Sequence, residues 1–342
     1  PIKNCEKMKL TRIFVPLVAS MVLYSCASNN LSYEGKAFKN AYASIKAEEL
    51  KKNLSVIASD EMQGRDTGSE GQKKAGQYMI NFYKKIGVSY PKALGSYYQI
   101  VPKEALKSRG KELPESENIL AFIEGTEKPD EIIVVSAHYD HVGTKDGVVY
   151  NGADDDGSGT VAVMEIAEAF QQAKKAGKGP KRSILFLHVT GEEHGLLGSK
   201  YYADHPVYDM KNTVVDLNID MIGRSDKENE GKNYVYVIGS EMLSSELKVI
   251  NEAANKITHN LELNYKYDDP KDPMRLYYRS DHYNFAKSGV PVAFYFDGIH
   301  ADYHQPTDDV DKIDFPLLQK RAQLVFATAW ELANRKDRIV VD

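Results

Sequence analysis

The stretch IIVVSAHYD, residues 132–140, decides the fold. Its first six residues are apolar or small and rich in β-branched side chains, which is typical of a strand buried on both faces. His138-Tyr139-Asp140 follows this strand directly. Further buried strands of the same kind are predicted at 118–124, 183–189, 213–219, 234–238 and 292–296.

Helices are predicted between these strands, over 72–83, 157–172 and 315–333, because apolar residues recur there at helical spacing. Gly87 is a natural stop for the first of them. The alternation of strands and helices favours a single α/β domain. Its central sheet is expected to be mixed but mainly parallel, with helices on both faces. The least regular segments, expected to be long loops near a pocket, are 89–117, 226–232 and 264–279.

Composition excludes several classes of protein. The 342 residues include 49 acidic and 44 basic side chains, and the net charge is −5. No charged run indicates a nucleic-acid partner. The two cysteines, Cys5 and Cys26, both lie near the amino terminus, which excludes a disulfide-stapled core and any site built on cysteine.

Residues 8–26 are typical of a bacterial secretory signal. A basic segment follows Met8, an uncharged apolar run spans 13–23, and Leu23-Tyr24-Ser25-Cys26 resembles a lipobox. We expect residues 1–25 to be the signal peptide with Met8 as the true start, residues 26–45 a tether lipidated at Cys26, and residues 46–342 the folded domain that carries the function. The apolar run is too short to span a bilayer. The protein is therefore expected in the bacterial cell envelope, lipid-anchored and facing the periplasm or exterior. The alternative for this segment is a buried helix.

Two histidines and three carboxylates are candidate metal ligands. Taken alone, each has an ordinary explanation, such as a capped loop end or a solvated helix start. Together they lie at the carboxyl ends of predicted strands or in the loop before the last helix, where open α/β sheets place their sites. The five residues are His138, Asp155, Glu193, Asp220 and His304.

These nitrogen and oxygen donors suit zinc, cobalt or manganese. Five ligands are too many for one structural tetrahedral zinc, but they fit two ions that share a carboxylate. Within Glu192-Glu193, one carboxylate can bind a metal while its neighbour takes a proton from water. Asp140 is placed to orient His138.

The order of the motifs resembles one known family. The motifs are His-x-Asp, Gly-Ala-x-Asp-Asp-x-Ser-Gly, Gly-Glu-Glu-x-Gly-Leu-x-Gly-Ser, Asp-Met-Ile-Gly, Ser-Asp-His-x-x-Phe and His-x-Pro-x-Asp. This set is similar to the co-catalytic di-zinc aminopeptidases of the bacterial leucyl aminopeptidase and aminopeptidase Y type. Their relatives include glutamate carboxypeptidase and glutaminyl cyclase. The resemblance spans roughly 54–334 and includes 64–69 as a segment on the substrate side.

The resemblance implies a zinc exopeptidase fold of the phosphorylase/hydrolase-like type with two Zn²⁺ ions, which Co²⁺ or Mn²⁺ could replace. His138 and Asp220 would bind one ion, His304 and Glu193 the other, and Asp155 both. The resemblance further implies Glu192 as general base, Asp140 as the group orienting His138, Tyr303 as a donor to the oxyanion and Arg279 as a substrate contact. The substrates would be peptides with a free amino terminus.

Three alternatives remain. A glutaminyl cyclase would use the same scaffold with one zinc, and a lipid-anchored binding protein would keep the fold without activity. The full ligand set and the Glu192-Glu193 pair favour the two-metal hydrolase. A serine hydrolase based on Ser158 is disfavoured because Asp156 occupies the position of the glycine in a nucleophile elbow.

Four tyrosines in 264–279 suggest an aromatic wall of the pocket. The sequence indicates neither the preferred terminal residue nor the oligomeric state.

Overall fold

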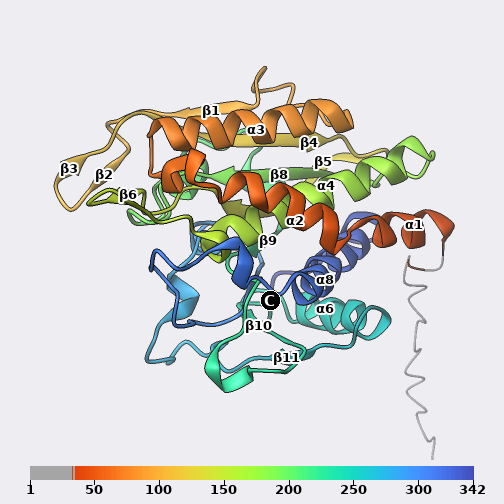
Figure 1. Ribbon diagram of the computed structural model, residues 1–342. Coiled ribbons are helices and arrows are strands. Elements are labelled where there is room, and N and C mark those ends of the chain that lie inside the picture. Colours follow the sequence, from red (N-terminus) through yellow and green to blue (C-terminus); the bar gives the residue numbers. More distant parts are fainter. Residues whose placement is uncertain (1–32, 34) are drawn as a thin grey trace, which may run out of the picture. The chain divides into compact units, whose positions relative to one another are not determined.

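The computed structural model describes Tyr33 and residues 35–342, so the predicted signal peptide and Cys26 lie outside the described residues. An eight-stranded sheet forms the centre, in the order β1-β4-β8-β5-β9-β12-β10-β11 (Figure 1). The bounds are β1 Tyr98–Val101, β4 Ser116–Ile123, β5 Lys128–His138, β8 Arg182–Val189, β9 Thr213–Ile219, β10 Tyr234–Ile238, β11 Glu262–Asn264 and β12 Val292–Phe296.

The four central strands, β8, β5, β9 and β12, run parallel to one another. Strands β1 and β4 on one side, and β10 on the other, join them in antiparallel pairs, and β11 pairs in parallel with β10. The expected mixed, mainly parallel sheet is confirmed. Because the central strands are parallel, their carboxyl ends meet at one edge of the sheet.

Successive side chains of β5 enter two different hydrophobic cores. Ile133 and Val135 belong to the first core, and Ile132 and Val134 to the second. This is the alternation that a strand buried on both faces requires. The sheet is therefore covered on both faces, as the sequence predicts.

The first core packs under most of the helices, and Figure 1 shows α2, α3 and α4 lying across this face of the sheet. These helices are α1 Lys36–Ser44, α2 Ala47–Ile57, α3 Glu70–Ile86, α4 Gly159–Lys175, α6 Ser245–Ile257 and α8 Phe315–Asn334. Two shorter helices, α5 (Leu197–Asp204) and α7 (His282–Ala286), contribute Tyr202 and Phe285 to the second core. The predicted helix over 72–83 is confirmed as α3, and it ends at Gly87 with the left-handed φ of 81° that glycine favours.

The tether predicted over 26–45 is wrong at its carboxyl-terminal end. Residues 36–44 form α1, whose Phe38 is buried and stacks on Phe326 of α8 with ring centroids 5.9 Å apart. Burial of this aromatic ring stabilises the folded state, so the segment packs on α8 and does not remain a flexible tether. The folded domain thus begins at least ten residues before the predicted boundary at residue 46.

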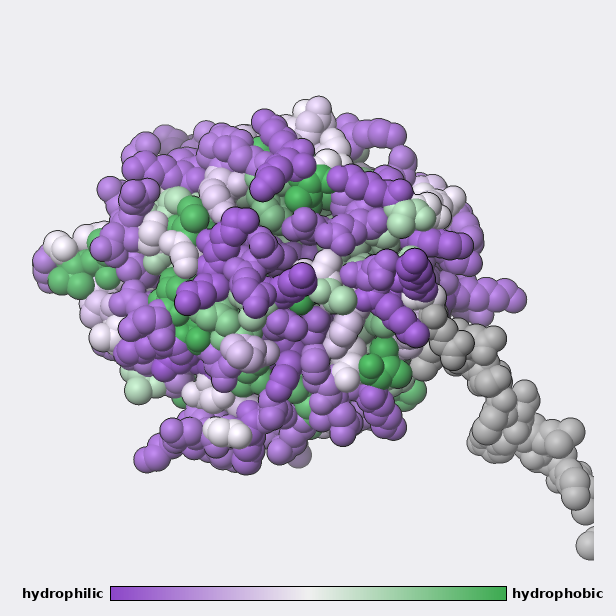
Figure 2. Space-filling model, turned by 45° about the vertical axis from the view of Figure 1, so that its right-hand side comes forward, coloured by the Kyte–Doolittle hydropathy of each residue, from purple (hydrophilic) through white to green (hydrophobic). Residues whose placement is uncertain are grey.

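The segment 89–117 is also more regular than predicted. It contains the edge strand β1 and a small hairpin of β2 (Lys107–Ser108) and β3 (Lys111–Glu112), which projects from the body in Figure 1. Residues 264–279 remain largely irregular, with one short turn of helix at Leu276–Tyr278. None of the helices in the described part of the chain has the length and apolar character needed to cross a bilayer. The face drawn in Figure 2 is mostly hydrophilic, with scattered apolar side chains.

Candidate active site

All five predicted metal ligands converge at the carboxyl edge of the parallel strands. His138 is the last residue of β5, and Asp220 follows β9 directly. The loop after β8 carries Glu193, and the irregular turn Ala153–Ser158 before α4 carries Asp155. His304 lies in the loop between β12 and α8. Topology therefore brings together residues that are up to 166 positions apart in the sequence.

A first group of polar atoms surrounds His138, whose ring is buried. Its Nε2 lies 3.3 Å from Asp155 Oδ1, 3.5 Å from Asp220 Oδ1 and 3.8 Å from Glu192 Oε2. Its Nδ1 lies 3.0 Å from the main-chain carbonyl oxygen of Asp140. Because a carbonyl can only accept, this contact assigns the ring proton to Nδ1 and leaves the Nε2 lone pair facing the carboxylates.

A second group surrounds Glu193. His304 Nε2 lies 2.9 Å from Glu193 Oε2 and 3.0 Å from Asp155 Oδ2. His141 Nδ1 lies 2.8 Å from Glu193 Oε1 and 3.8 Å from Asp155 Oδ2. Asp155 thus directs one oxygen to each group. Sequence analysis missed His141, although its place three residues after His138 in the same strand-end turn was a usable signal.

Asp140 supports the site differently from the prediction. Its carboxylate is 3.6 Å from His138 Nδ1, and its main-chain carbonyl makes the closer contact. The carboxylate oxygens instead accept hydrogen bonds from the backbone N–H groups of Glu192 at 3.1 Å and Glu193 at 3.3 Å. The Thr67 hydroxyl donates a third, at 3.2 Å. Asp140 therefore holds the loop that carries both glutamates.

The two adjacent glutamates differ in their electrostatic environment. Burial raises the pKa of the Glu192 carboxyl well above its usual range, and the charges of Glu193 and Asp220 add to this against the opposing effect of His138. For Glu193, burial also acts to raise the pKa, but contacts with His141 and His304 outweigh it and the pKa is lowered. The two neighbouring carboxyls therefore differ in proton affinity, and Glu192 is the one that accepts a proton more readily, as a base does.

Several buried polar atoms of the site make no hydrogen bond within the described chain. They are His138 Nε2, His304 Nε2, Asp155 Oδ2, Glu193 Oε1 and both ring nitrogens of His141. Such atoms are rare in folded proteins unless water or an ion satisfies them. These imidazole nitrogens and carboxylate oxygens can each bind a metal ion, and pairs of them lie 2.8–3.8 Å apart. The residues therefore fit divalent metal ions such as zinc.

A nearby buried cluster is formed by Asp154, Asp297 and His300. Asp154 accepts hydrogen bonds from the Gly223 N–H at 2.7 Å and the Ser158 hydroxyl at 2.9 Å, and His300 Nε2 lies 2.9 Å away. Asp297 lies 3.5 Å from the Arg321 guanidinium. These contacts join the loops around the site to one another.

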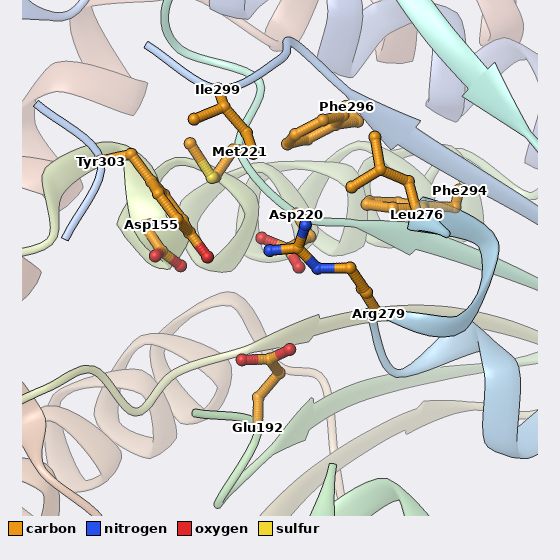
Figure 3. A pocket seen from close by; sticks show the side chains of 10 residues that line it. All are labelled: Asp155, Glu192, Asp220, Met221, Leu276, Arg279, Phe294, Phe296, Ile299 and Tyr303. Carbon is orange, nitrogen blue, oxygen red and sulfur yellow. The ribbon is translucent and has the colours of Figure 1, made fainter. Parts of the chain in front are cut away.

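A pocket adjoins the first group and has two chemically different sides (Figure 3). The carboxylates Asp155, Glu192 and Asp220 form the polar side. The apolar side consists of Met221, Leu276, Phe294, Phe296 and Ile299. None of the tyrosines of 264–279 lines this pocket, whose aromatic rings are Phe294 and Phe296 of β12 and Tyr303. Tyr278 of that segment lines an adjoining pocket together with Glu192, Arg279 and Tyr303.

Arg279 and Tyr303, both predicted from sequence, complete the lining of this pocket. Arg279 is exposed. Burial and the charges of Asp155 and Glu193 raise the pKa of the Tyr303 hydroxyl, which therefore stays protonated and available as a donor.

The expectation that segment 64–69 faces the substrate is wrong for Arg65. Its guanidinium is fully buried and donates to four main-chain carbonyls, those of Tyr139 at 2.8 Å, Ile57 at 2.9 Å, Asn151 at 2.7 Å and Gly152 at 3.0 Å. Arg65 thus fixes the end of β5 and the approach to Asp155 from behind the site.

Comparison with known proteins identifies the family of the chain. Residues 118–329 match Peptidase family M28. A probable leucine aminopeptidase of Arthroderma otae is 30% identical over 222 residues, which cover 63% of this chain and 57% of that protein. The chain therefore spans little more than half of that relative's length.

Two solved structures share the fold. The LapA aminopeptidase of Legionella pneumophila aligns with a TM-score of 0.70 at 19% identity, over 97% of this chain and 81% of that one. A glutaminyl cyclase of Bacteroides thetaiotaomicron aligns with a TM-score of 0.65 at 18% identity, over 84% and 98%. At these identities the likeness concerns the fold alone. The family match covers well over half of the sequence, and the chain belongs to peptidase family M28.

Proposed function

We propose that the chain is a zinc-dependent aminopeptidase that hydrolyses the amino-terminal residue from peptides. The observation that carries this proposal is the position of Asp155, whose two oxygens face two separate groups of ligand atoms. The names of the aminopeptidases that resemble this chain in sequence and in fold support the same reaction class.

Two zinc ions are proposed, each held by a histidine and carboxylates. His138 and Asp220 would hold one, Glu193 and His304 the other, and Asp155 would bridge them. When bound, such ions polarise the scissile carbonyl and make a water molecule acidic enough to be deprotonated near neutral pH.

The remaining steps belong to side chains of the pocket. Glu192 would take the proton of the attacking water and pass it to the leaving amine, and its raised pKa suits holding that proton between the two steps. The protonated Tyr303 hydroxyl would donate a hydrogen bond to the oxyanion that develops on the carbonyl.

The two-sided pocket supports a substrate with a free amino group and an apolar first side chain. The ammonium group would lie against Glu192 and Asp220, and the side chain against Phe294 and Phe296. We propose that leucine- or methionine-like termini are preferred over charged ones, because the apolar wall offers no partner for a charge. The exposed Arg279 would contact the peptide near the entrance.

Glutaminyl cyclase activity is the nearest alternative on this scaffold. It requires one zinc, so one of the two groups of ligand atoms would then have no ion to hold. The presence of both groups favours the hydrolase over the cyclase.

The test is Glu192→Gln, with the exposed Glu104→Gln as matched control. We expect Glu192→Gln to lower kcat on leucine arylamides by about 100- to 10 000-fold, the usual contribution of a general base, while zinc content stays at two per chain. Glu104→Gln should leave both unchanged. Near-normal turnover of Glu192→Gln would refute the base. One zinc per wild-type chain together with cyclisation of glutaminyl peptides would replace the peptidase by the cyclase.

We also propose that the protein is a lipoprotein of the bacterial envelope, attached through Cys26. The support is the sequence Leu23-Tyr24-Ser25-Cys26 after the basic and apolar run. In a bacterial host, the full chain should incorporate labelled palmitate and sediment with membranes, and Cys26→Ser should do neither. Equal labelling of both chains would contradict the anchor.

A further inference from the structure

His141 is built into the site as firmly as the predicted ligands. Its backbone N–H donates to the carbonyl oxygen of Arg65 at 3.1 Å, and its ring is completely buried. The ring packs on Gly152, where an added Cβ would lie 2.5 Å from ring atoms Cγ and Cδ2. Gly152 also has a φ of 54°, a left-handed conformation that glycine favours. Its lack of a side chain leaves room for the imidazole.

The imidazole of His141 faces the second group of ligand atoms. Its Nδ1 lies 2.8 Å from Glu193 Oε1 and 3.8 Å from Asp155 Oδ2, and its ring centroid is 5.7 Å from that of His304. Neither ring nitrogen makes a hydrogen bond to another described residue, although both are buried. A buried imidazole whose nitrogens make no hydrogen bond is unfavourable, and the close approach of Nδ1 to a carboxylate oxygen points to a cation shared by the two.

The spacing of His141, Asp155 and Glu193 fits one ion, because each residue places a ligand atom within 4.8 Å of the other two. With zinc–nitrogen and zinc–oxygen distances of about 2.0–2.2 Å, neighbouring ligand atoms in a tetrahedron lie about 3.3–3.5 Å apart. The nitrogen–oxygen separations between His141 or His304 and Asp155 or Glu193 range from 2.8 to 3.8 Å and bracket this value.

We infer that His141 is a sixth metal ligand, which binds through Nδ1 to the ion held by Glu193 and His304. This inference rests on the proposed function, because it requires a metal in the site. That ion would have two imidazoles and two carboxylates, whereas the ion at His138 would have one imidazole. The two ions should therefore bind with different affinities.

The competing explanation is that His141 only donates a hydrogen bond to Glu193 and positions it. Asparagine separates the two cases, because its amide N–H reaches nearly the place of Nδ1 and can keep the hydrogen bond, but it lacks the imidazole lone pair. Phenylalanine keeps the shape of the ring and removes both functions. His194 provides the control, since its side chain is 27% exposed and its Nε2 contacts Asp66 at 3.0 Å.

The experiment is calorimetric titration of the metal-free full chain with zinc, for wild type, His141→Asn, His141→Phe and His194→Asn. We expect two zinc ions per wild-type chain. Both His141 variants should weaken one of the two sites at least tenfold and change the visible absorption of the cobalt-substituted protein. His194→Asn should stay within threefold of wild type, with an unchanged cobalt spectrum.

Wild-type zinc affinity and cobalt spectrum in His141→Asn, with loss only in His141→Phe, would overturn the inference and leave the proposed function intact. A wild-type chain that binds no zinc would overturn both. Where the variants fail to fold, a crystal structure of the zinc-loaded wild type decides. A zinc–Nδ1 distance of about 2.0–2.3 Å supports ligation, and one beyond about 3 Å refutes it.

Discussion

Asp140 shows how one residue can hold two parts of a site in place through its main chain and its side chain. Its main-chain carbonyl fixes the proton and the orientation of the His138 ring, while its carboxylate receives the N–H groups of Glu192 and Glu193. Hydrogen bonds to an ionised acceptor are about twice as strong as neutral ones. The position of the loop that carries Glu192 and Glu193 relative to His138 therefore depends on Asp140, which need not touch substrate or metal.

Asp140→Asn tests this dependence with a nearly isosteric change. The new amide presents an N–H where a backbone N–H must be accepted, so the loop carrying the glutamates should shift. We expect kcat on leucine arylamides to fall by about 100-fold and zinc affinity by about 10- to 100-fold, as for other groups that hold ligands. Kinetics and zinc titration measure the two effects.

The control for that change is Asp66→Asn, which alters a carboxylate 46% exposed at the rim of the site. It should change kcat by less than threefold. Unaltered kcat and zinc binding in Asp140→Asn would show that the loop is held by its other contacts.

At the scale of residues, sequence predicted the groups that follow strand ends, because parallel strands bring those ends to one edge. It did not predict Arg65, whose acceptor Gly152 lies 87 residues away and leaves no local pattern. His141 was missed for another reason. It stands beside His138-Tyr139-Asp140 in the sequence, and only the packing against Gly152 turns its ring toward Glu193.

At the scale of elements, the buried Arg65 side chain connects α2, β5 and the loop before Asp155 by hydrogen bonds. It binds the carbonyl of Ile57 at the end of α2, that of Tyr139 just after β5, and two in the segment before Asp155. A buried guanidinium is costly unless its donors are satisfied, and these carbonyls together with nearby aspartates compensate it. Helix, strand and loop are thereby tied at the point where the site needs rigidity.

The predicted boundaries agree best where a strand is buried on both faces. Strands β10 and β12 have the limits predicted from sequence, because their apolar runs are interrupted sharply by polar or turn residues. Strand β1 was not predicted, because an edge strand of four residues has little sequence pattern of its own and forms only by pairing with β4. Helix α1 was missed because its burial depends on Phe326 and Trp330, nearly 300 residues later.

At the scale of the molecule, the sheet separates two hydrophobic cores and leaves its carboxyl edge to the loops of the site. Global stability therefore depends on the helices over each face, and one of these contacts contains a buried acid. Glu165 of α4 accepts a hydrogen bond from the Asn53 amide of α2 at 2.7 Å. Burial raises the pKa of Glu165 to about 8 from its ordinary 4.5, and the nearby charges of Glu168 and Glu49 add to this.

This raised pKa predicts a loss of stability as the pH rises from about 4.5 to about 8. Between pH 4.5 and about 8 the folded chain keeps a proton on Glu165 that the unfolded chain has released. The contribution is complete below pH 4.5 and disappears as the pH rises through about 8. The free energy of unfolding should fall by at most about 1.4 kcal/mol per pH unit from this group. Glu165→Gln removes the titration, so the variant should gain stability relative to wild type as the pH rises.

Urea unfolding at pH 5, 6.5, 8 and 9, at constant free zinc concentration, measures this difference. Fixed zinc is needed because metal binding has its own pH dependence. The exposed Glu104→Gln should follow the wild-type profile throughout. If Glu165→Gln also runs parallel to wild type at all four pH values, Glu165 is ionised in the folded protein, and the contact between α2 and α4 must then accommodate a buried charge.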